Sequence, residues 1–106
     1  MREATFLILT ALADEPRHGY GIIQDVAGLS GGRVNLLPGT LYAALDRLVA
    51  QGLVEPSHEE VVDGRLRRYY RLHADGQAEL ARQTERLRQL ASAAETRLRA
   101  LRPRTA

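Results

Sequence analysis

The chain has 106 residues, enough for one domain with a modest core, and 44% of them are hydrophobic, as is ordinary for a folded protein. It has no Cys, which excludes disulfides and thiolate chemistry, and no apolar run reaches the ~18–20 residues of a membrane span. The net charge of +2 divides unevenly: residues 1–64 hold four Arg and nine acids (−5), and residues 65–106 hold eleven Arg and four acids (+7). The opening residues do not resemble a signal peptide, so we expect a cytoplasmic protein.

The first predicted element is a helix over residues 4–13, ATFLILTALA, which is apolar nearly all round. A domain this small cannot easily cover every face of such a helix. We therefore expect one side to pack on its own domain and the other on a second subunit, with Phe6 and Leu9 in a dimer interface. Pro16 ends the helix, because the residue before a proline is driven away from helical angles.

A second, shorter helix is predicted from His18 to Leu29, with His18 as a hydrogen-bonding residue at its start and a buried stripe of Ile22, Ile23, Val26 and Ala27. Gly19 and Gly21 lie in its first turn, where they lower helix stability. They indicate a close approach of the backbone, either to a neighbouring helix or to a phosphate. Residues 30–32, SGG, break the helix, and residues 33–37 are expected to form a brief extended segment.

The third helix begins at Pro38 and runs toward Leu53, with Gly52 suited to the left-handed residue that ends it. Its predicted buried stripe is Leu41, Leu45 and Leu48, broadened by Ala44 and Val49. The opposite face carries small or hydrogen-bonding side chains, which allow a helix to lie deep in the major groove of DNA. The residues of this recognition helix that we predict to contact DNA are Thr40, Tyr42, Ala43 and Arg47.

A β-hairpin follows, with Asp63-Gly64 as its tight turn and a return strand from Leu66 to Leu72, in which Tyr70 is in phase for the core. Four arginines lie within seven residues with no acid among them: Arg65, Arg67, Arg68 and Arg71. By itself this cluster fits either phosphate contact or a solvated edge that deters strand pairing. Placed on a hairpin after three helices, it favours a DNA-contacting wing. The fold class is mainly α with a small β-hairpin, a winged helix-turn-helix over residues 1–73.

Residues 74–102 are predicted to form one long helix, followed by a tail at residues 103–106. Apolar residues recur every seven positions at Leu80, Leu87, Ala94 and Leu101, with Leu90 and Leu98 beside them. The helix would be ~40 Å long, too long to pack fully on so small a domain. Its seam therefore needs a partner helix, and twofold pairing with a second copy is the simplest solution.

With these elements placed, residues 4–76 closely resemble the PadR family of transcriptional regulators, in its shorter subgroup with a single C-terminal helix. The matching signatures occur in order: HGY at 18–20, GTLY at 39–42, ALDRL at 44–48 with GLV at 52–54, and RRYYRL at 67–72. The resemblance implies a dimeric repressor with the third helices and wings on DNA and the last helices building the dimer.

The resemblance also implies roles for single residues. Thr40 and Tyr42 would meet DNA at the start of the recognition helix. Tyr20 would lie near the DNA backbone, beside His18 at the start of the second helix. In the wing, the residues that would contact phosphate or the minor groove are Arg65, Arg67 and Arg68. In members that sense small molecules, the ligand lies between the domain and the dimerisation helices. The sequence departs from the family pattern at Ala43, where Pro is common, at His73, where Thr is common, and in having no Trp.

Histidines 18, 58 and 73 share no metal-ligand spacing, and no phosphate loop or nucleophile motif is present, so we expect no enzyme, metal or cofactor. The predicted function is a sequence-specific regulator that binds a pseudo-palindromic operator as a homodimer, released by a small-molecule effector in the dimer interface. The alternative is a winged-helix module that binds protein rather than DNA. The acidic balance of residues 1–64 favours that alternative, although only the docking surface matters for DNA.

Overall fold

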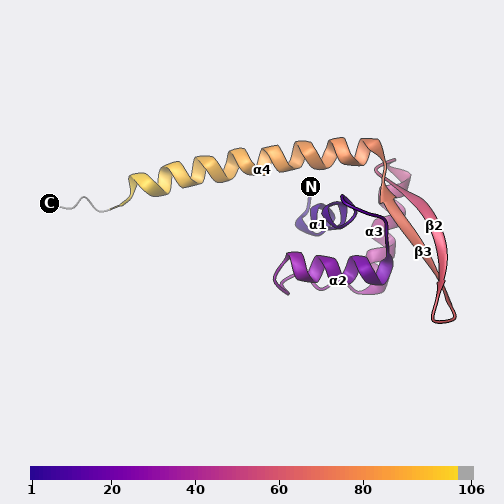
Figure 1. The fold of residues 1–106 in the computed structure, drawn as a ribbon. Helices are drawn as coiled ribbons and strands as arrows, with labels where there is room; N and C mark the ends of the chain where they lie inside the picture. Colours follow the sequence, from indigo (N-terminus) through magenta and orange to yellow (C-terminus); the bar gives the residue numbers. More distant parts are fainter. Residues whose placement is uncertain (103–106) are drawn as a thin grey trace.

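The structure is a computed structural model, and it describes residues 1–102; the predicted tail at 103–106 lies outside the described residues. The elements follow one another along the chain as α1 (Glu3–Ala11), β1 (Arg17–His18), α2 (Gly19–Leu29), α3 (Pro38–Ala50), β2 (Val54–Val62), β3 (Arg65–Leu72) and α4 (Ala74–Ala100) (Figure 1). The predicted winged helix-turn-helix with a long C-terminal helix is confirmed.

The core lies between α1, α2, α3 and the sheet, and its largest fully buried side chains include Ile8, Ile22, Leu41, Leu45 and Leu48. The stripe predicted on α3 is confirmed for its three leucines and Ala44. Val49 was wrongly placed in this stripe, because its side chain is 36% exposed.

The apolar character of α1 has a different cause from the predicted one. One side of α1 packs on α2, and another packs beneath the first half of α4 of the same chain (Figure 1). Leu9 is 0% exposed, so the prediction that Leu9 contacts a second subunit is wrong. The reason is the path of α4, which turns back from the sheet and covers α1. Phe6 stays half-buried at the edge of this contact.

The sheet is antiparallel, with strand order β1-β3-β2. The sequence analysis missed β1, which pairs Arg17 with Tyr70 and His18 with Tyr69. Two residues are too few to produce an alternating pattern, and only the partner strand stabilises them. Residues 33–37, predicted to be extended, form no strand and lead directly into α3.

The hairpin has the predicted turn, since Asp63 and Gly64 both take positive φ angles of 52° and 77°, as the tight turns of β-hairpins require. Between Pro56 and Glu59 the register of β2 against β3 shifts. Pro56 has no N–H to donate, which is typical of a bulge. Tyr70 is buried as predicted, whereas Leu66 is 64% exposed because it lies where the hairpin extends beyond the core.

The first turn of α4 is seated tightly on the domain. His73 caps it by accepting a hydrogen bond from the Asp75 N–H through Nδ1 (3.1 Å), and the His73 N–H donates to the Leu53 carbonyl (3.0 Å). Gly76 is buried, and a Cβ at that position would collide with the same carbonyl. His73 thus fills the capping role that Thr commonly has in the family.

Leu80 packs against the core, and α4 continues over α1 before it extends beyond the domain (Figure 1). The radius of gyration is 17.5 Å, against about 13 Å for a compact chain of this length. The longest dimension is 69 Å, against 27 and 21 Å for the others. No helix among residues 1–102 is long and apolar enough to cross a membrane.

We predict that Gly76→Ala lowers the free energy of unfolding by about 1–3 kcal/mol, because the added methyl forces α4 away from the Leu53 carbonyl. Gly28→Ala is the matched control, since a Cβ there meets nothing within 4 Å. We expect that control to be neutral or to stabilise the protein by up to about 1 kcal/mol. Urea unfolding at one protein concentration measures both, and equal stability of the two variants would contradict the prediction.

Candidate nucleic-acid interface

The start of α2, the start of α3 and the middle of β3 meet around a hollow of about 260 Å³, lined by His18, Gly19, Tyr20, Tyr42, Leu66, Arg67 and Arg68. A second hollow of about 370 Å³ adjoins it and is lined by Tyr20, Arg65, Leu66 and Arg67. Six of the nine residues predicted to contact DNA therefore line one continuous surface, although they come from β1, α2, α3 and β3. We call it the wing–helix surface.

The other three predicted residues, Thr40, Ala43 and Arg47, are exposed on α3. They point away from the core because the buried stripe of α3 lies on its opposite side. The face of α3 that the sequence identified is thus open to solvent, and Tyr42 at its flank joins it to the wing–helix surface.

Gly19 is explained by Tyr42. A Cβ on Gly19 would lie 2.5 Å from the Tyr42 hydroxyl oxygen and 2.9 Å from Cζ, so a larger residue at this position would require the Tyr42 side chain to move. Two interpretations of Gly19 were given above. The close approach of a neighbouring helix agrees with the structure, because Tyr42 belongs to α3. Gly21 lies against the His18 ring, whose Cε1 would be 3.6 Å from an added Cβ.

His18 caps α2, as predicted, by accepting a hydrogen bond from the Gly21 N–H through Nδ1 (3.2 Å). The guanidinium of Arg67 also points at this ring, with Nη1 3.2 Å from Nδ1 and 3.5 Å from Nε2. Burial, and then the positive charge of Arg67, lower the pKa of His18 below its ordinary value of 6.5. His18 is therefore mostly neutral at pH 7, with Nδ1 as its acceptor nitrogen, and its Nε2 carries the ring proton and does not accept from Arg67.

Arg67 is consequently not the free phosphate ligand that the sequence suggested. It is half-buried, and among residues 1–102 its Nε atom is buried without a hydrogen-bond partner. Glu60 lies opposite it in the hairpin register, but its carboxylate is 3.1 Å from the His58 Nε2 atom. The pairing of β1 with β3 brings His18 beside Arg67, which a reading of the hairpin alone could not show.

Tyr69 is a residue that the sequence analysis missed. Its ring meets the His18 ring edge-on at 5.2 Å and stacks on the His58 ring at 4.4 Å, with 13° between the planes. A hydrogen bond to the Glu60 carboxylate raises the pKa of the Tyr69 hydroxyl. His58 is exposed, and its ring lies over Tyr69 in the segment where the register of β2 against β3 shifts. Within residues 1–102 no cluster of three acidic or His side chains could hold a metal ion.

The wing carries less net positive charge than its cluster of four arginines suggests. Strands β2 and β3 with their turn carry four Arg and four acids, so the hairpin has no net charge. Arg71 is paired with Glu55 (2.8 Å). Arg65 and Arg68, and Arg47 on α3, form no ion pair within residues 1–102. Positive charge on this surface is therefore confined to a few arginines.

We predict that the pKa of His18, measured by NMR titration, lies below 6.5 in the free protein. Arg67→Ala should raise it, because the repelling charge is removed, whereas Arg65→Ala should leave it unchanged. A lowered pKa means that protonation favours the unfolded chain, so His18 stabilises the fold less as the pH falls below about 6.5. A His18 pKa that does not respond to Arg67→Ala would contradict the geometry.

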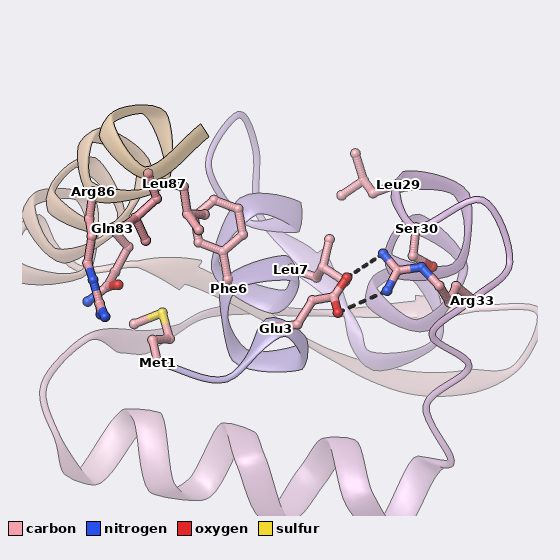
Figure 2. Close-up of a pocket in the computed structure, with 11 residues that line it drawn as sticks. Met1, Glu3, Phe6, Leu7, Leu29, Ser30, Arg33, Gln83, Arg86 and Leu87 are labelled. Carbon is pink, nitrogen blue, oxygen red and sulfur yellow. Dashed lines mark hydrogen bonds and ion pairs between the residues drawn. The ribbon is translucent and has the colours of Figure 1, made fainter. Parts of the chain in front are cut away.

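A third hollow, of about 490 Å³, lies between α1, the α2–α3 loop and α4 (Figure 2). Figure 2 shows Phe6 of α1 beside Leu87 of α4 and, on the other side, Glu3 paired with Arg33 (Oε2–Nη1 3.0 Å). This pair lowers the pKa of Glu3. Three residues of the predicted dimer interface line the hollow: Phe6, Leu87 and Leu90.

Comparison with known proteins identifies the family. The family model described as "Transcriptional regulator PadR-like family" matches residues 8–82. The chain belongs to the PadR-like family. Its description names transcriptional regulators rather than enzymes, and the match spans α2, α3, the hairpin and the first part of α4.

Among curated relatives of this PadR-like chain, the transcriptional regulator Rv3488 of Mycobacterium tuberculosis is 44% identical over 84 residues, which cover 79% of this chain and 75% of Rv3488. An uncharacterised 37.1 kDa protein in a transposon of Streptomyces fradiae is 48% identical over 58 residues. The match covers 55% of this chain but only 16% of that relative.

Solved PadR-family structures share the fold. A PadR-family regulator from Clostridium difficile aligns with a TM-score of 0.76 at 23% identity, covering 92% of this chain and 99% of that one. Bacillus subtilis PadR, solved in complex with operator DNA, aligns with a TM-score of 0.68 at 20% identity, covering 78% and 47% of the two chains.

Proposed function

We propose that this PadR-like regulator is a repressor that binds double-stranded DNA as a homodimer, with the wing–helix surface and the exposed face of α3 on the duplex. The observation that carries the proposal is the meeting of six predicted DNA-contacting residues, from β1, α2, α3 and β3, around one surface. The fold shared with Bacillus subtilis PadR, whose structure contains operator DNA, supports it.

In this proposal α3 enters the major groove, where Thr40 and Ala43 face the base edges and Arg47 reaches a phosphate or a guanine. The wing lies along the neighbouring backbone, with Arg65 and Arg68 on phosphates. Both guanidinium groups are exposed and unpaired within residues 1–102, so neither must give up an ion pair to bind. Contacts to phosphate position the protein, and the small side chains of α3 supply the discrimination between sequences.

The competing function is a winged-helix module that binds another protein. The observation that favours it is the hairpin's lack of net charge, because a DNA-contacting wing gains affinity from excess positive charge. The two functions differ in their response to salt. Only DNA binding releases condensed counterions in proportion to the phosphates neutralised.

We predict measurable binding to a random duplex at low salt, with an affinity that falls steeply as salt is raised. Arg68→Ala should reduce the slope of log K against log salt by about one unit, since it removes one phosphate contact. Arg82→Ala on α4 is the control, because Arg82 is paired with Glu79 away from the wing–helix surface. Absence of duplex binding at low salt would favour the protein-binding module.

The proposed dimer rests on α4. Gly76 is the one buried residue in this 27-residue helix among those the structure describes. Leu80, which was predicted to belong to the apolar seam, packs instead against the core of its own chain. The rest of the seam is exposed in the single chain, at Leu87 (50%), Leu90 (56%), Leu98 (64%) and Leu101 (77%), with Ala94 between them. A second copy related by a twofold axis would bury this seam and place two α3 helices on one face of DNA. The operator would then be pseudo-palindromic, with half-sites about 10 bp apart or at multiples of that spacing.

We predict that Leu87→Glu weakens dimerisation at least about tenfold and DNA binding with it, since an unpaired charge in a buried seam is strongly destabilising. Gln89→Glu adds the same charge on the opposite side of α4 and should change neither property. Analytical ultracentrifugation and operator titration measure the two effects. A monomeric Leu87→Glu protein with unchanged operator affinity would refute the dimer.

The hollow in Figure 2 is the place we propose for an effector that releases the repressor. It lies between the domain and α4, and its apolar walls include Phe6, Leu87 and Leu90. A ligand there would contact both the DNA-binding domain and the dimerisation helix, so it could bias their relative position. The absence of Trp argues against stacking of flat aromatic drugs.

A further inference from the structure

The wing–helix surface combines a shortage of positive charge with an arginine that is turned inward. Arg65, Arg67 and Arg68 are its basic side chains, and Arg67 is held on the His18 ring. Acidic side chains lie close by, since Glu59 and Glu60 are paired in register with Arg68 and Arg67. A DNA duplex that approaches this surface therefore meets fewer unengaged arginine side chains than the sequence alone suggests.

We propose that DNA binding draws Arg67 from His18 onto a phosphate and that His18 then takes up one proton from solvent at Nδ1, where the proton replaces the hydrogen bonds accepted from Arg67 and the Gly21 N–H, so that the two side chains form a cationic phosphate site together. The proposal rests on the proposed function, because the ligand is the phosphodiester backbone of duplex DNA. It adds a proton-linked step and a role for His18 that the family assignment does not contain.

The first argument is the poor satisfaction of Arg67. Its Nη1 donates to a neutral imidazole nitrogen that already accepts from the Gly21 N–H, and its Nε is buried without a partner among residues 1–102. A phosphate offers charged oxygens that can accept two parallel N–H bonds from one guanidinium, and such bonds are roughly twice as strong as neutral ones. Both residues line the 260 Å³ hollow, together with Tyr20 and Arg68.

The second argument concerns the charges that face His18. Arg67 and Tyr69 face it from β3, Glu60 contributes from β2, and Tyr42 lies against Gly19 from α3. Of these, Arg67 opposes protonation and Glu60 favours it. A phosphate that pairs with Arg67 cancels the opposing charge and adds a negative one. The imidazole is then more basic in the complex than in the free protein.

The sign of the pH dependence follows by linkage. The complex binds more protons than the free protein between the two pKa values of His18, so affinity rises as the pH falls through that range. One proton corresponds to at most a tenfold rise in affinity per pH unit. Below the pKa of the free protein the affinity levels off, because His18 is then protonated in both states.

The test is the Kd for one duplex at constant ionic strength from about pH 8 to about pH 5.5. We expect the wild-type protein to gain up to about tenfold per unit, and His18→Asn to lose this dependence. Asn is chosen because its side-chain oxygen can still accept the Gly21 N–H and cap α2. His73→Asn is the matched control, since His73 caps α4 in the same way but lies outside the wing–helix surface, and it should keep the wild-type slope.

Calorimetry in two buffers of different ionisation enthalpy measures the proton directly. We expect uptake approaching one proton for the wild type, almost none for His18→Asn, and less than wild type for Arg67→Ala, in which the free His18 is already more basic. Duplex binding without proton uptake, or with an unchanged slope in His18→Asn, would overturn this inference and leave the proposed function intact. No duplex binding at any pH would instead overturn the proposed function.

Discussion

The pairing of Arg17 and His18 with Tyr70 and Tyr69 joins the helix-turn-helix to the wing, and the candidate interface depends on it. It brings the start of α2 beside the middle of β3. His18 therefore contacts Tyr69 and Arg67, although some 50 residues of the chain separate it from these two. The close approach of Tyr42 to Gly19 then brings α3 to the same place. Two short contacts between segments distant in sequence thus assemble one surface from β1, α2, α3 and β3.

The position of α4 is set by an equally small contact. Gly76 and the His73 cap seat its first turn on the Leu53 carbonyl, and the helix then runs back over α1. This path covers α1 within the chain and leaves the leucine seam of α4 open. The same contact therefore decides which apolar surface belongs to the core and which is available to a second copy.

Much of the fold could be predicted because its signals are local. The spacing of Leu41, Leu45 and Leu48 identifies the buried side of α3 from helical geometry alone, and Asp63-Gly64 identifies the hairpin turn from the φ angles these residues tolerate. β1 could not be predicted, since two residues carry no periodicity. Leu9 and Val49 were misplaced because an apolar residue indicates burial but not which element buries it. For Gly19 the sequence indicated a close contact but not its partner, Tyr42.

By itself the sequence determined the kinds and order of elements, the exposed face of α3, the exposed seam of α4 and the family, since each follows from residue type and short-range spacing. Tertiary structure decided where charge and hydrogen bonds lie. The run of arginines from Arg65 to Arg71 becomes a hairpin without net charge, because the strand opposite carries the acids. Arg67 turns from a solvent-facing cation into the partner of a neutral His18, because a strand of two residues places them together. Electrostatics depends on distance in space, and the order of residues along a chain does not contain that distance.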